Sequence, residues 1–381
     1  MENLDERTID VLFAIIRAAF DVSIDEVHIT QKDVLEIERI ASRQNIMYII
    51  ITGLKKMGCS ELLTERMGKF IPKAYYDFFQ RKESLQEVMN ALDESQIPYI
   101  PLKGSILRSL YPDPCMRTSS DIDVLVNESD IEDAVKSVEE KTSFNKDAMS
   151  YHNVSLVNKR IHLELHFNIK ENDEKTDRLL SLAWDFANRT ATGYRYVFTP
   201  EYEIFYTLAH MKHHFVNGGL GIRPFLDLWL LRNRTKYNGN LVEELMSKCG
   251  ILKFYTECSY LSEVWLGNKK HTETSLRFEE FCLSGGVFGS EKFMVAAQQR
   301  NKRGWKYVAS RVFPPKYQVK EFYKTNDGKE HTASYYYAKR LRSWISKNRR
   351  SEFKRRVGTA LKSDKNYQDK ANELFSRLGL R

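Results

Sequence analysis

Apolar residues recur at helical spacing through the first part of the chain. Ile9, Leu12 and Ile16 set this spacing near the N-terminus, and Leu85 to Leu92 continue it. Recurrence at every third or fourth position is typical of the buried face of an amphipathic helix. We therefore predict an N-terminal helical region over residues 1–95.

A different pattern follows, in which short apolar runs alternate with turn residues. Residues 97–102 have the composition of a short extended run, and residues 106–111 favour a short helix. The prolines and serines in 112–120 favour a loop. The run Asp121-Ile-Asp-Val-Leu-Val126 then predicts a strand.

The next segment combines a helix with a strand pair. Ser129 and Glu132 have the spacing of a capping box, which predicts a helix over residues 130–140. A strand pair is expected within 150–169. Helix and strands in this order form a small α/β unit, which we place in residues 96–199.

Helical signals return after this unit. Thr199 suits an N-cap and Pro200 suits the first helical position. Residues 218–221 break the pattern before further helices, so we predict a helical domain over 200–282 and a C-terminal helical region with a basic tail over 283–381. The expected fold class is α+β, with a small mixed sheet flanked by helical regions.

Composition narrows the class of protein. The chain is 42% apolar and 29% charged, with a mean hydropathy of −0.50, which is typical of a globular protein. Its length of 381 residues predicts roughly two to three domains. The longest apolar run, around Ile46 to Leu54, is too short to cross a bilayer. The N-terminus is acidic, and the five cysteines lack the close pairing of a zinc ribbon or disulfide framework. We expect a cytoplasmic protein without a membrane segment.

Positive charge is concentrated at the C-terminus. The formal net charge is +8, yet residues 339–381 hold 14 Lys/Arg against 4 Asp/Glu, so the rest of the chain is nearly neutral. Basic side chains of this tail, together with Trp344 and Phe353, can attract a phosphate backbone. The alternative is one solvated face of a terminal helix.

Two strands carry acidic side chains on one face. Asp121 and Asp123 share a face because side chains alternate along a strand, and Glu164 has a similar position in the run from Ile161 to Phe167. Carboxylates held together repel each other unless a cation neutralises them. Mg²⁺ (or Mn²⁺) is the simplest candidate, since it binds carboxylates together with substrate phosphates. A solvated strand face is the alternative.

A Gly-Ser turn upstream of the acidic strand suits a phosphate. Gly104 and Ser105 precede a predicted helix, where exposed backbone N–H groups favour an anion. Gly104 allows close approach because it has no side chain. Lys103 and Arg117 add positive charge nearby in the sequence.

These residues together resemble the DNA polymerase beta-like nucleotidyltransferase superfamily over about residues 96–170. Its common form is a Gly-Ser turn, an Asp-x-Asp strand and a third acidic strand residue, here Gly104-Ser105, Asp121-Ile-Asp123 and Glu164. The interval between turn and aspartates is slightly longer than in the compact members. The resemblance implies a small polymerase-beta-like palm.

A narrower resemblance extends further along the chain. Pro101-Leu-Lys-Gly104 and Arg117-Thr-Ser-Ser-Asp-Ile-Asp-Val-Leu-Val126 resemble a bacterial branch of poorly characterised nucleotidyltransferases. This resemblance continues through His210, Arg223 and Asp227. It makes these three residues candidates for contacts with substrate.

The resemblance implies two-metal nucleotidyl transfer, in which a nucleoside monophosphate moves from an NTP to an acceptor hydroxyl and pyrophosphate leaves. The two aspartates would bridge the ions, and the glutamate would hold the ion that activates the acceptor. The Gly-Ser turn would hold the triphosphate. Lys103 or Arg117 would neutralise charge on the leaving pyrophosphate.

Histidines are the remaining candidates for chemistry. His162 and His166 flank Glu164, which allows a zinc site, support of the carboxylates, contact with substrate or a solvated face. His210 and His214 share a helix face, where contact with nucleotide or acceptor and ordinary helix packing both remain open. The zincin pattern is absent there.

Two further patterns have structural alternatives. Arg223 and Asp227 are four residues apart, so they can pair with each other rather than belong to the site. The glycines of 285–289 do not form a dinucleotide fingerprint and predict a tight turn.

Other function classes stay open beside the transferase. One is a non-catalytic nucleotide-binding or regulatory module with the same fold, which retained, mutually repelling carboxylates disfavour. Another is a metal-dependent phosphohydrolase, which would release phosphate rather than pyrophosphate. The acceptor can be RNA, bound through the basic tail, a small hydroxyl compound or a protein side chain. The sequence leaves the preferred NTP and the oligomeric state undetermined.

Overall fold

The computed structural model describes most of the chain up to the C-terminal region. The described residues are 5–159, 161–287, 289, 291–299, 332–343 and 365–380. Trp344, Phe353 and the basic residues of 347–356 lie outside them. The nucleic-acid prediction for the tail therefore stays a prediction.

The N-terminal residues form helices, as their apolar spacing predicts. These helices are α1 (Glu6–Ala19), α2 (Gln31–Gln44), α3 (Met47–Lys56) and α4 (Glu65–Glu94). The starts of α1 and α2 are capped by side chains: Asp5 accepts from the Thr8 amide, and Thr30 and Asp33 form a capping box. The prediction of helices over this region is confirmed.

A five-stranded mixed sheet follows. Its strands are β1 (Tyr99–Pro101), β2 (Asp121–Val126), β3 (Asn145–Met149), β4 (Asn153–Val157) and β5 (His162–His166). The strand order is β1-β2-β5-β4-β3, with β2 and β5 parallel and the other pairs antiparallel. The predicted strand at 121–126 and the later strand pair are confirmed. The fold class is α+β, as predicted.

The helix after β2 is present, but its predicted cap is wrong. Helix α6 spans Ile131–Lys141, and a 3₁₀ turn over Glu128–Asp130 precedes it. This turn places Asp130, not Ser129, at the N-cap, and the structure records no side-chain cap there. The Ser129 hydroxyl donates to the Asp130 carboxylate instead.

Short elements lie between and after the strands of this sheet. Helix α5 (Gly104–Leu107) lies between β1 and β2. After β5 come α7 (Glu174–Leu180), β6 (Ala187–Arg189) and β7 (Tyr196–Phe198), which lead to the remaining helices. The later helices are α8 (Pro200–Asn217), α9 (Arg223–Arg234), α10 (Gly239–Lys248), α11 (Leu252–Leu266), α12 (Glu273–Leu283), α13 (Glu291–Gln299), α16 (Ala333–Ser343) and α18 (Lys365–Arg377). Thr199 accepts from the Tyr202 amide, so the predicted start of α8 is confirmed.

Two hydrophobic clusters organise the protein. One lies between the sheet and the helices α4 and α6, where Val88 and Val138 meet the strand residues Val124 and Leu165. The other joins the N-terminal helices to α8–α12 and α18. Within it Phe13 stacks on Trp265, with ring centroids 4.8 Å apart. The predicted division into four regions stays a prediction, although residues from all four of those regions contribute to this core.

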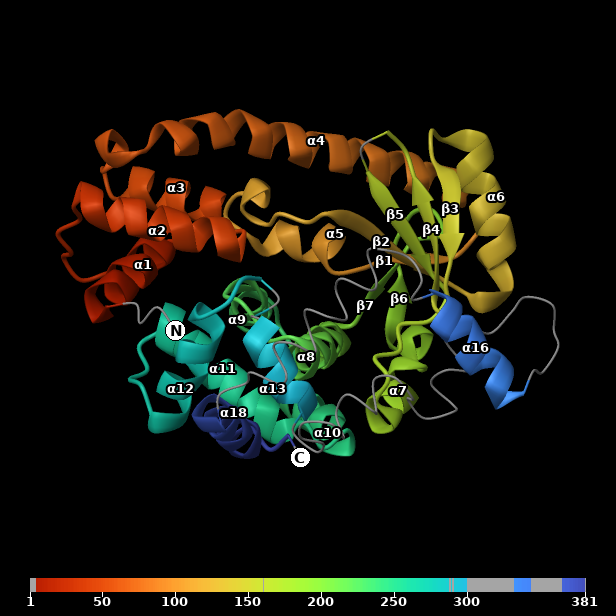
Figure 1. Cartoon of the computed structure of the whole chain (residues 1–381). Coiled ribbons are helices and arrows are strands. Elements are labelled where there is room, and N and C mark those ends of the chain that lie inside the picture. Colours follow the sequence, from red (N-terminus) through yellow and green to blue (C-terminus); the bar gives the residue numbers. More distant parts are fainter. Residues whose placement is uncertain are drawn as a thin grey trace.

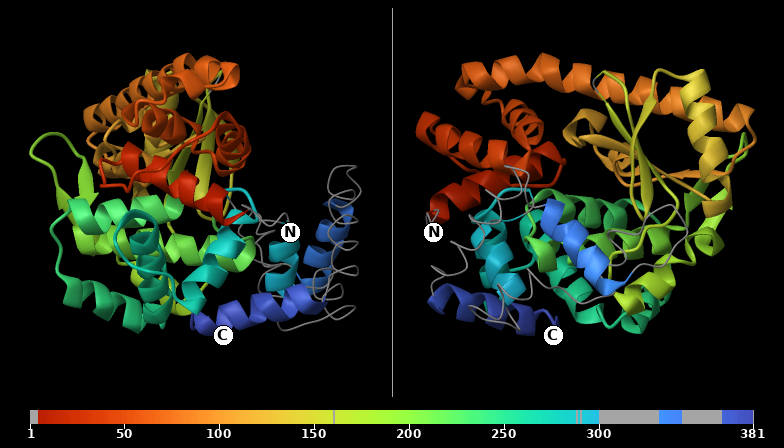
Figure 2. Two further views of the ribbon diagram at one scale, coloured as in Figure 1. Left: turned by 90° about the vertical axis from the view of Figure 1, so that its left-hand side faces the viewer. Right: turned by 45° about the vertical axis from the view of Figure 1, so that its right-hand side comes forward.

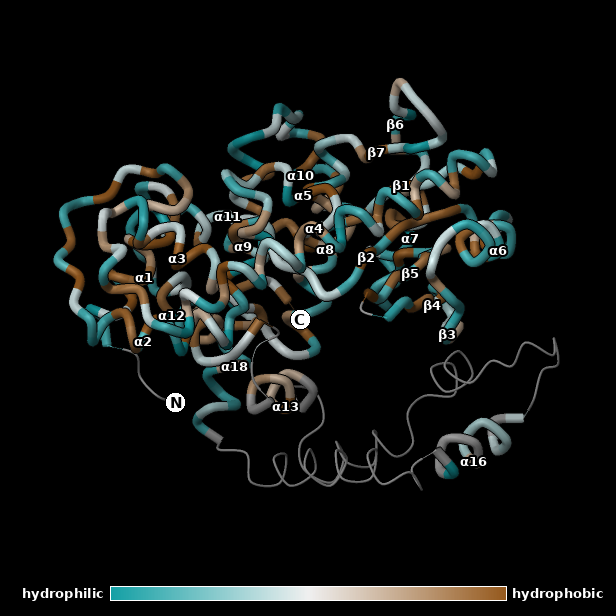
Figure 3. Tube along the Cα trace, turned by 90° about the horizontal axis from the view of Figure 1, so that it is seen from above, coloured by the Kyte–Doolittle hydropathy of each residue, from teal (hydrophilic) through white to brown (hydrophobic). Residues whose placement is uncertain are grey.

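The figures show how these elements surround the sheet. Helix α4 runs from the side of α1–α3 to the sheet and α6, and α8–α11 lie on the other side of the molecule (Figure 1). Helix α18, deep blue in Figure 2, packs against α12 and α13. Arg277 of α12 donates there to Glu373 of α18 at 2.7 Å. Strand β2 is apolar along most of its length (Figure 3).

Among the helices that the structure describes, none combines the length and the apolar character that a membrane span requires.

Candidate functional site

The parallel pairing of β2 with β5 brings the predicted acids together. In the register of these strands Asp123 is directly beside Glu164, Asp121 is beside His162, and Leu125 is beside His166. Apolar residues at the alternate positions, such as Ile122 and Leu163, are buried in the sheet core. The period of two therefore aims the acids at the opposite face.

His166 ties two of these carboxylates together. Its Nε2 lies 3.0 Å from Asp123 Oδ1 and 3.2 Å from Glu164 Oε2. The Asn153 amide also donates to Glu164, at 2.7 Å. Asp123, Glu164 and His166 present ligand atoms within 4.8 Å of one another. Such a donor set of two carboxylates and an imidazole suits a divalent cation.

Two other predicted residues take different places. Asp121 lies outside this close group but shares with Asp123 and Glu164 the cavity described below. His162 Nε2 lies 2.7 Å from the Ser155 hydroxyl, so its ring is directed along the sheet. The group whose ligand atoms lie close enough to share a cation is therefore Asp123, Glu164 and His166, and not the set His162, Glu164 and His166 that the zinc alternative named.

The acids experience different electrostatic environments. Burial and the charges of Asp123 and Glu164 raise the pKa of Asp121. Burial also disfavours the charge of Asp123, but the hydrogen bond with His166 and the charge of Lys103 hold its pKa below the usual range. A cation among these groups would relieve the repulsion that Asp121 experiences.

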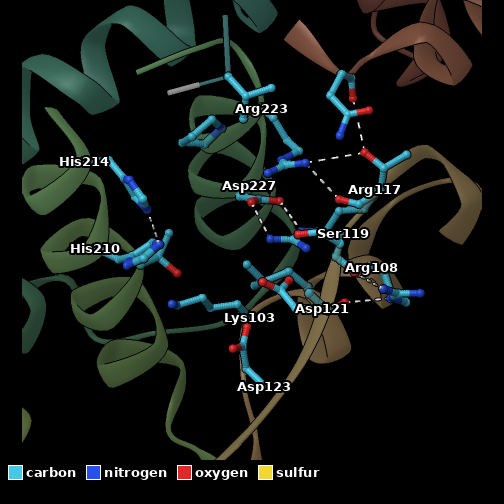
Figure 4. A pocket seen from close by; sticks show the side chains of 18 of the residues that line it. Lys103, Arg108, Arg117, Ser119, Asp121, Asp123, His210, His214, Arg223 and Asp227 are labelled. Carbon is cyan, nitrogen blue, oxygen red and sulfur yellow. Dashed lines mark hydrogen bonds and ion pairs between the residues drawn. The ribbon is translucent and has the colours of Figure 1, made fainter. Parts of the chain in front are cut away.

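A cavity of about 760 Å³ opens in front of these acids. Its walls come from α4, the segments 103–108 and 117–123, β5, α8 and α9. Its basic lining residues are Lys73, Arg81, Lys103, Arg108, Arg117, Lys170 and Arg223. Figure 4 shows the Lys103 side chain directed between the histidines of α8 and the aspartates of β2.

Lys103 is held in an unusual backbone conformation. Its φ is +40°, in a region that non-glycine residues rarely adopt. Its ammonium lies 5.3 Å from the centre of the Tyr206 ring. The adjoining turn therefore places a positive charge beside the acids at some cost in backbone strain.

The turn after Lys103 is shaped by close packing. A Cβ on Gly104 would lie 2.7 Å from Arg117 Nη1 and 3.2 Å from the Ser119 Cβ, so this position requires glycine. Ser105 is not among the described residues that line the cavity, and its N–H donates to the Leu102 carbonyl at 3.1 Å. The phosphate contact predicted for Ser105 stays a prediction.

Replacing Gly104 by alanine should destabilise the protein. The new methyl group would press on Arg117 and Ser119, and overpacking of this kind costs about 1–3 kcal/mol. Thermal unfolding of G104A should show a lower Tm. Gly68→Ala is the matched control, because no described atom lies within 4 Å of its Cβ and alanine favours the exposed α4 helix by about 0.5–1 kcal/mol. Equal shifts for both variants would contradict the packing argument.

Arg117 and Asp227 form a buried ion pair in the wall of the cavity. Arg117 Nε and Nη2 donate to the Asp227 carboxylate at 2.8 and 2.9 Å, and the Tyr111 hydroxyl donates at 2.7 Å. Arg223 Nη1 instead donates to the Thr118 carbonyl at 2.9 Å. The alternative that Arg223 and Asp227 pair with each other is therefore wrong.

Glu203 is a buried acid next to this pair. Its Oε1 has no hydrogen-bond partner in the part of the chain that the structure describes. Burial raises its pKa to about 7, against the opposing effect of Arg117. Sequence reasoning missed Glu203, because an acid in the first turn of a helix is favourable whether or not it has a function.

Stability should depend on pH through Glu203. Because its folded pKa is raised, its favourable contribution is full below the ordinary value and is lost as pH rises through about 7. E203Q should therefore be more stable than the wild type by about 2 kcal/mol at pH 8, with little difference at pH 4. Tm values at both pH values test this, with the exposed substitution Glu243→Gln as control. A difference that does not change with pH would contradict it.

The predicted histidines of α8 also reach the cavity. His210 and His214 lie together, with their Nε2 atoms 2.7 Å apart. His210 Nδ1 lies 2.8 Å from Glu171 Oε1. Sequence reasoning missed Glu171, although an acid a few residues past the end of the acidic strand was a usable signal.

Arg108 is another residue that the sequence did not reveal. Its Nε donates to the Gly104 carbonyl at 2.7 Å, and its Nη2 donates to the Ser119 hydroxyl at 3.0 Å. Burial and the nearby charges of Arg117 and Arg81 lower its pKa to about 10. Its position four residues after Gly104 was the available signal, since that spacing returns to the same helix face.

Comparison with protein families gives one match. A family model described as "Uncharacterised nucleotidyltransferase" matches residues 30–267, a segment that contains all of the site residues above. Comparison with curated proteins gives no match, and comparison with solved structures gives none. Because the matched segment covers more than half of the sequence, the chain belongs to this family of uncharacterised nucleotidyltransferases.

Proposed function

We propose that the protein transfers a nucleoside monophosphate from an NTP to an acceptor hydroxyl, with a divalent cation (Mg²⁺ or Mn²⁺) and release of pyrophosphate. The observation that carries this proposal is the register that places Asp123 beside Glu164, with Asp121 on the same face, at a cavity lined by basic residues. Family membership supports the same activity. The same features support a place in the DNA polymerase beta-like superfamily.

Asp121, Asp123 and Glu164 would hold the cations. When bound, divalent cations would polarise the α-phosphate and stabilise the attacking and leaving oxygens. His166 would position Asp123 and Glu164, since it contacts both. Its Nδ1 is buried and has no hydrogen-bond partner among the described residues, so the polar contacts that orient the ring are those of Nε2 with the carboxylates.

The basic lining would bind the triphosphate. Lys103 is the best placed to contact phosphate, because its ammonium lies beside the acids and forms no ion pair with another described residue. Arg117 is engaged by Asp227, and its Nη1 lies against the space above Gly104. We therefore assign Arg117 to holding the turn, and Lys103 with the Gly104 backbone to contact with phosphate.

A transfer assay tests the proposal. The full chain is incubated with Mg²⁺ and each NTP labelled at the α-phosphate, with RNA, protein or small-molecule fractions as acceptors. Label on one acceptor fraction and equimolar pyrophosphate are expected. Release of free phosphate would instead indicate a phosphohydrolase, and NTP binding without turnover over every fraction would indicate a non-catalytic module.

A further inference from the structure

We propose that Glu171, His210 and His214 form a proton relay that receives the proton of the acceptor hydroxyl. This inference rests on the proposed function, because it concerns the acceptor side of the same cavity. The three side chains come from the segment after β5 and from one face of α8. None of them belongs to the carboxylate set that we assign to the cations.

The three groups are connected by short hydrogen bonds. His214 Nε2 lies 2.7 Å from His210 Nε2, and His210 Nδ1 lies 2.8 Å from Glu171 Oε1. Two imidazole nitrogens at that distance require one N–H and one lone pair. A proton gained by His214 can therefore be matched by a proton that passes from His210 to Glu171.

A third histidine fixes the direction of the hydrogen bonds in the relay. His213 Nδ1 lies 3.0 Å from the Glu171 carbonyl oxygen and 3.0 Å from Glu171 Oε2. A carbonyl oxygen only accepts, so His213 Nδ1 carries a hydrogen and donates. With Glu171 ionised, His210 Nδ1–H also donates to it, which leaves His210 Nε2 to accept from His214 Nε2–H. Glu171 is then the hydrogen-bond acceptor at the end of the relay.

Burial favours this arrangement of protons. Burial lowers the pKa of His210 well below its ordinary value and is also the main cause that lowers the pKa of His214 to about 3. Both rings are therefore neutral at rest. Burial also raises the pKa of Glu171, which makes the carboxylate a better resting place for a proton. The charged or titratable groups that face the relay are Lys103, Asp123, His152, His166, Asp177, Tyr206 and His213.

The relay lies where an acceptor can meet the nucleotide. All three residues line the cavity that contains Asp121 and Asp123. Glu171 also lines a second cavity of about 1090 Å³, bounded by α7 and α8. An acceptor that approaches through this second cavity would therefore reach the nucleotide beside Glu171 and the histidine pair.

The proposed step balances without another reactant. The acceptor oxygen forms a bond to the α-phosphorus while the bond from that phosphorus to the pyrophosphate oxygen breaks, and pyrophosphate leaves with the electron pair. The acceptor proton enters at the histidine pair. Protons shift along the hydrogen bonds, and the carboxylate of Glu171 becomes protonated.

Nitrogen NMR of ¹⁵N-histidine-labelled full-length protein tests the relay without any substrate. We expect neutral His210 and His214 from pH 5 to 8, with hydrogen on His210 Nδ1 and His214 Nε2. E171Q should change the His210 signals, since the carboxylate acceptor is lost. Two rings that titrate independently near the ordinary value of about 6.5 would overturn the relay.

Kinetics test its role in the reaction. With Mg²⁺-ATP and water as the acceptor, AMP formation by E171Q should fall about 100-fold in kcat with ATP affinity unchanged, as expected for general base catalysis. The rise of kcat with pH should disappear in E171Q, which a merely structural role would not cause. Added imidazole should raise the rate of AMP formation by H214A at least about tenfold. Full activity in both variants would overturn the relay.

A matched control separates the relay from general effects. His271 also lies beside a buried glutamate, with its Nε2 3.6 Å from Glu279 Oε2, but it does not line either cavity. H271Q should leave the pH profile unchanged. If the wild type neither forms AMP nor labels any acceptor fraction while the NMR pattern is as expected, the proposed reaction fails but the relay geometry stands.

Discussion

Replacing Asp123 by asparagine is expected to lower metal-dependent nucleotidyl transfer by about a thousandfold. Asparagine keeps the shape of the side chain but removes the negative charge beside Glu164. Asp123 is the more deeply placed of these two acids, with 13% of its side chain exposed against 26% for Glu164. Because little solvent reaches Asp123, water cannot compensate for the loss of its negative charge in that variant. Initial rates of pyrophosphate release at saturating Mg²⁺ measure the effect.

The control for this variant is Asp147→Asn. Asp147 lies on β3 of the same sheet and is exposed, so the same chemical change occurs without loss of a cavity charge. D147N should retain wild-type rates, and circular dichroism should show both variants folded. Transfer by D123N within tenfold of the wild-type rate would exclude Asp123 from the mechanism.

Removing Asp227 should cause the largest loss of stability. Its carboxylate pairs with Arg117, and the two side chains are only 7% and 8% exposed. D227A would leave the guanidinium buried without a counter-charge, which costs about 3–5 kcal/mol. Urea unfolding followed by circular dichroism measures this change in the free energy of unfolding.

Two comparisons make this prediction specific. Loss of one partner of the exposed pair Glu65–Lys69 on α4, in E65Q, should change the free energy by less than about 1 kcal/mol. Replacing both members of the buried pair, as in R117M/D227L, should recover most of the loss because no lone charge remains. A double variant as unstable as D227A would show that the ion pair is not the cause.

Local patterns were enough to predict much of the fold and part of the site. The alternation in 121–126 fixed the face of the two aspartates, and Thr199 with Pro200 marked the start of α8. Spacing of four residues predicted the shared face of His210 and His214. Each of these signals depends on neighbours within one turn or a few strand positions.

The remaining features depend on contacts between distant segments. Arg117 and Asp227 are 110 residues apart, so no local spacing points to their pairing. Strand β3 was missed because all five of its residues are exposed and carry no alternation. Ser129 matched a capping box, but a 3₁₀ turn moved the helix start to the next residues.

The most direct measurement is a crystal structure of the full chain with Mn²⁺ and an ATP analogue that cannot be cleaved at the α-phosphate. We expect anomalous peaks for Mn²⁺ in contact with Asp121, Asp123 and Glu164, and a triphosphate beside Lys103. Nucleotide bound elsewhere, or Mn²⁺ absent from these three carboxylates at saturating concentration, would contradict this expectation.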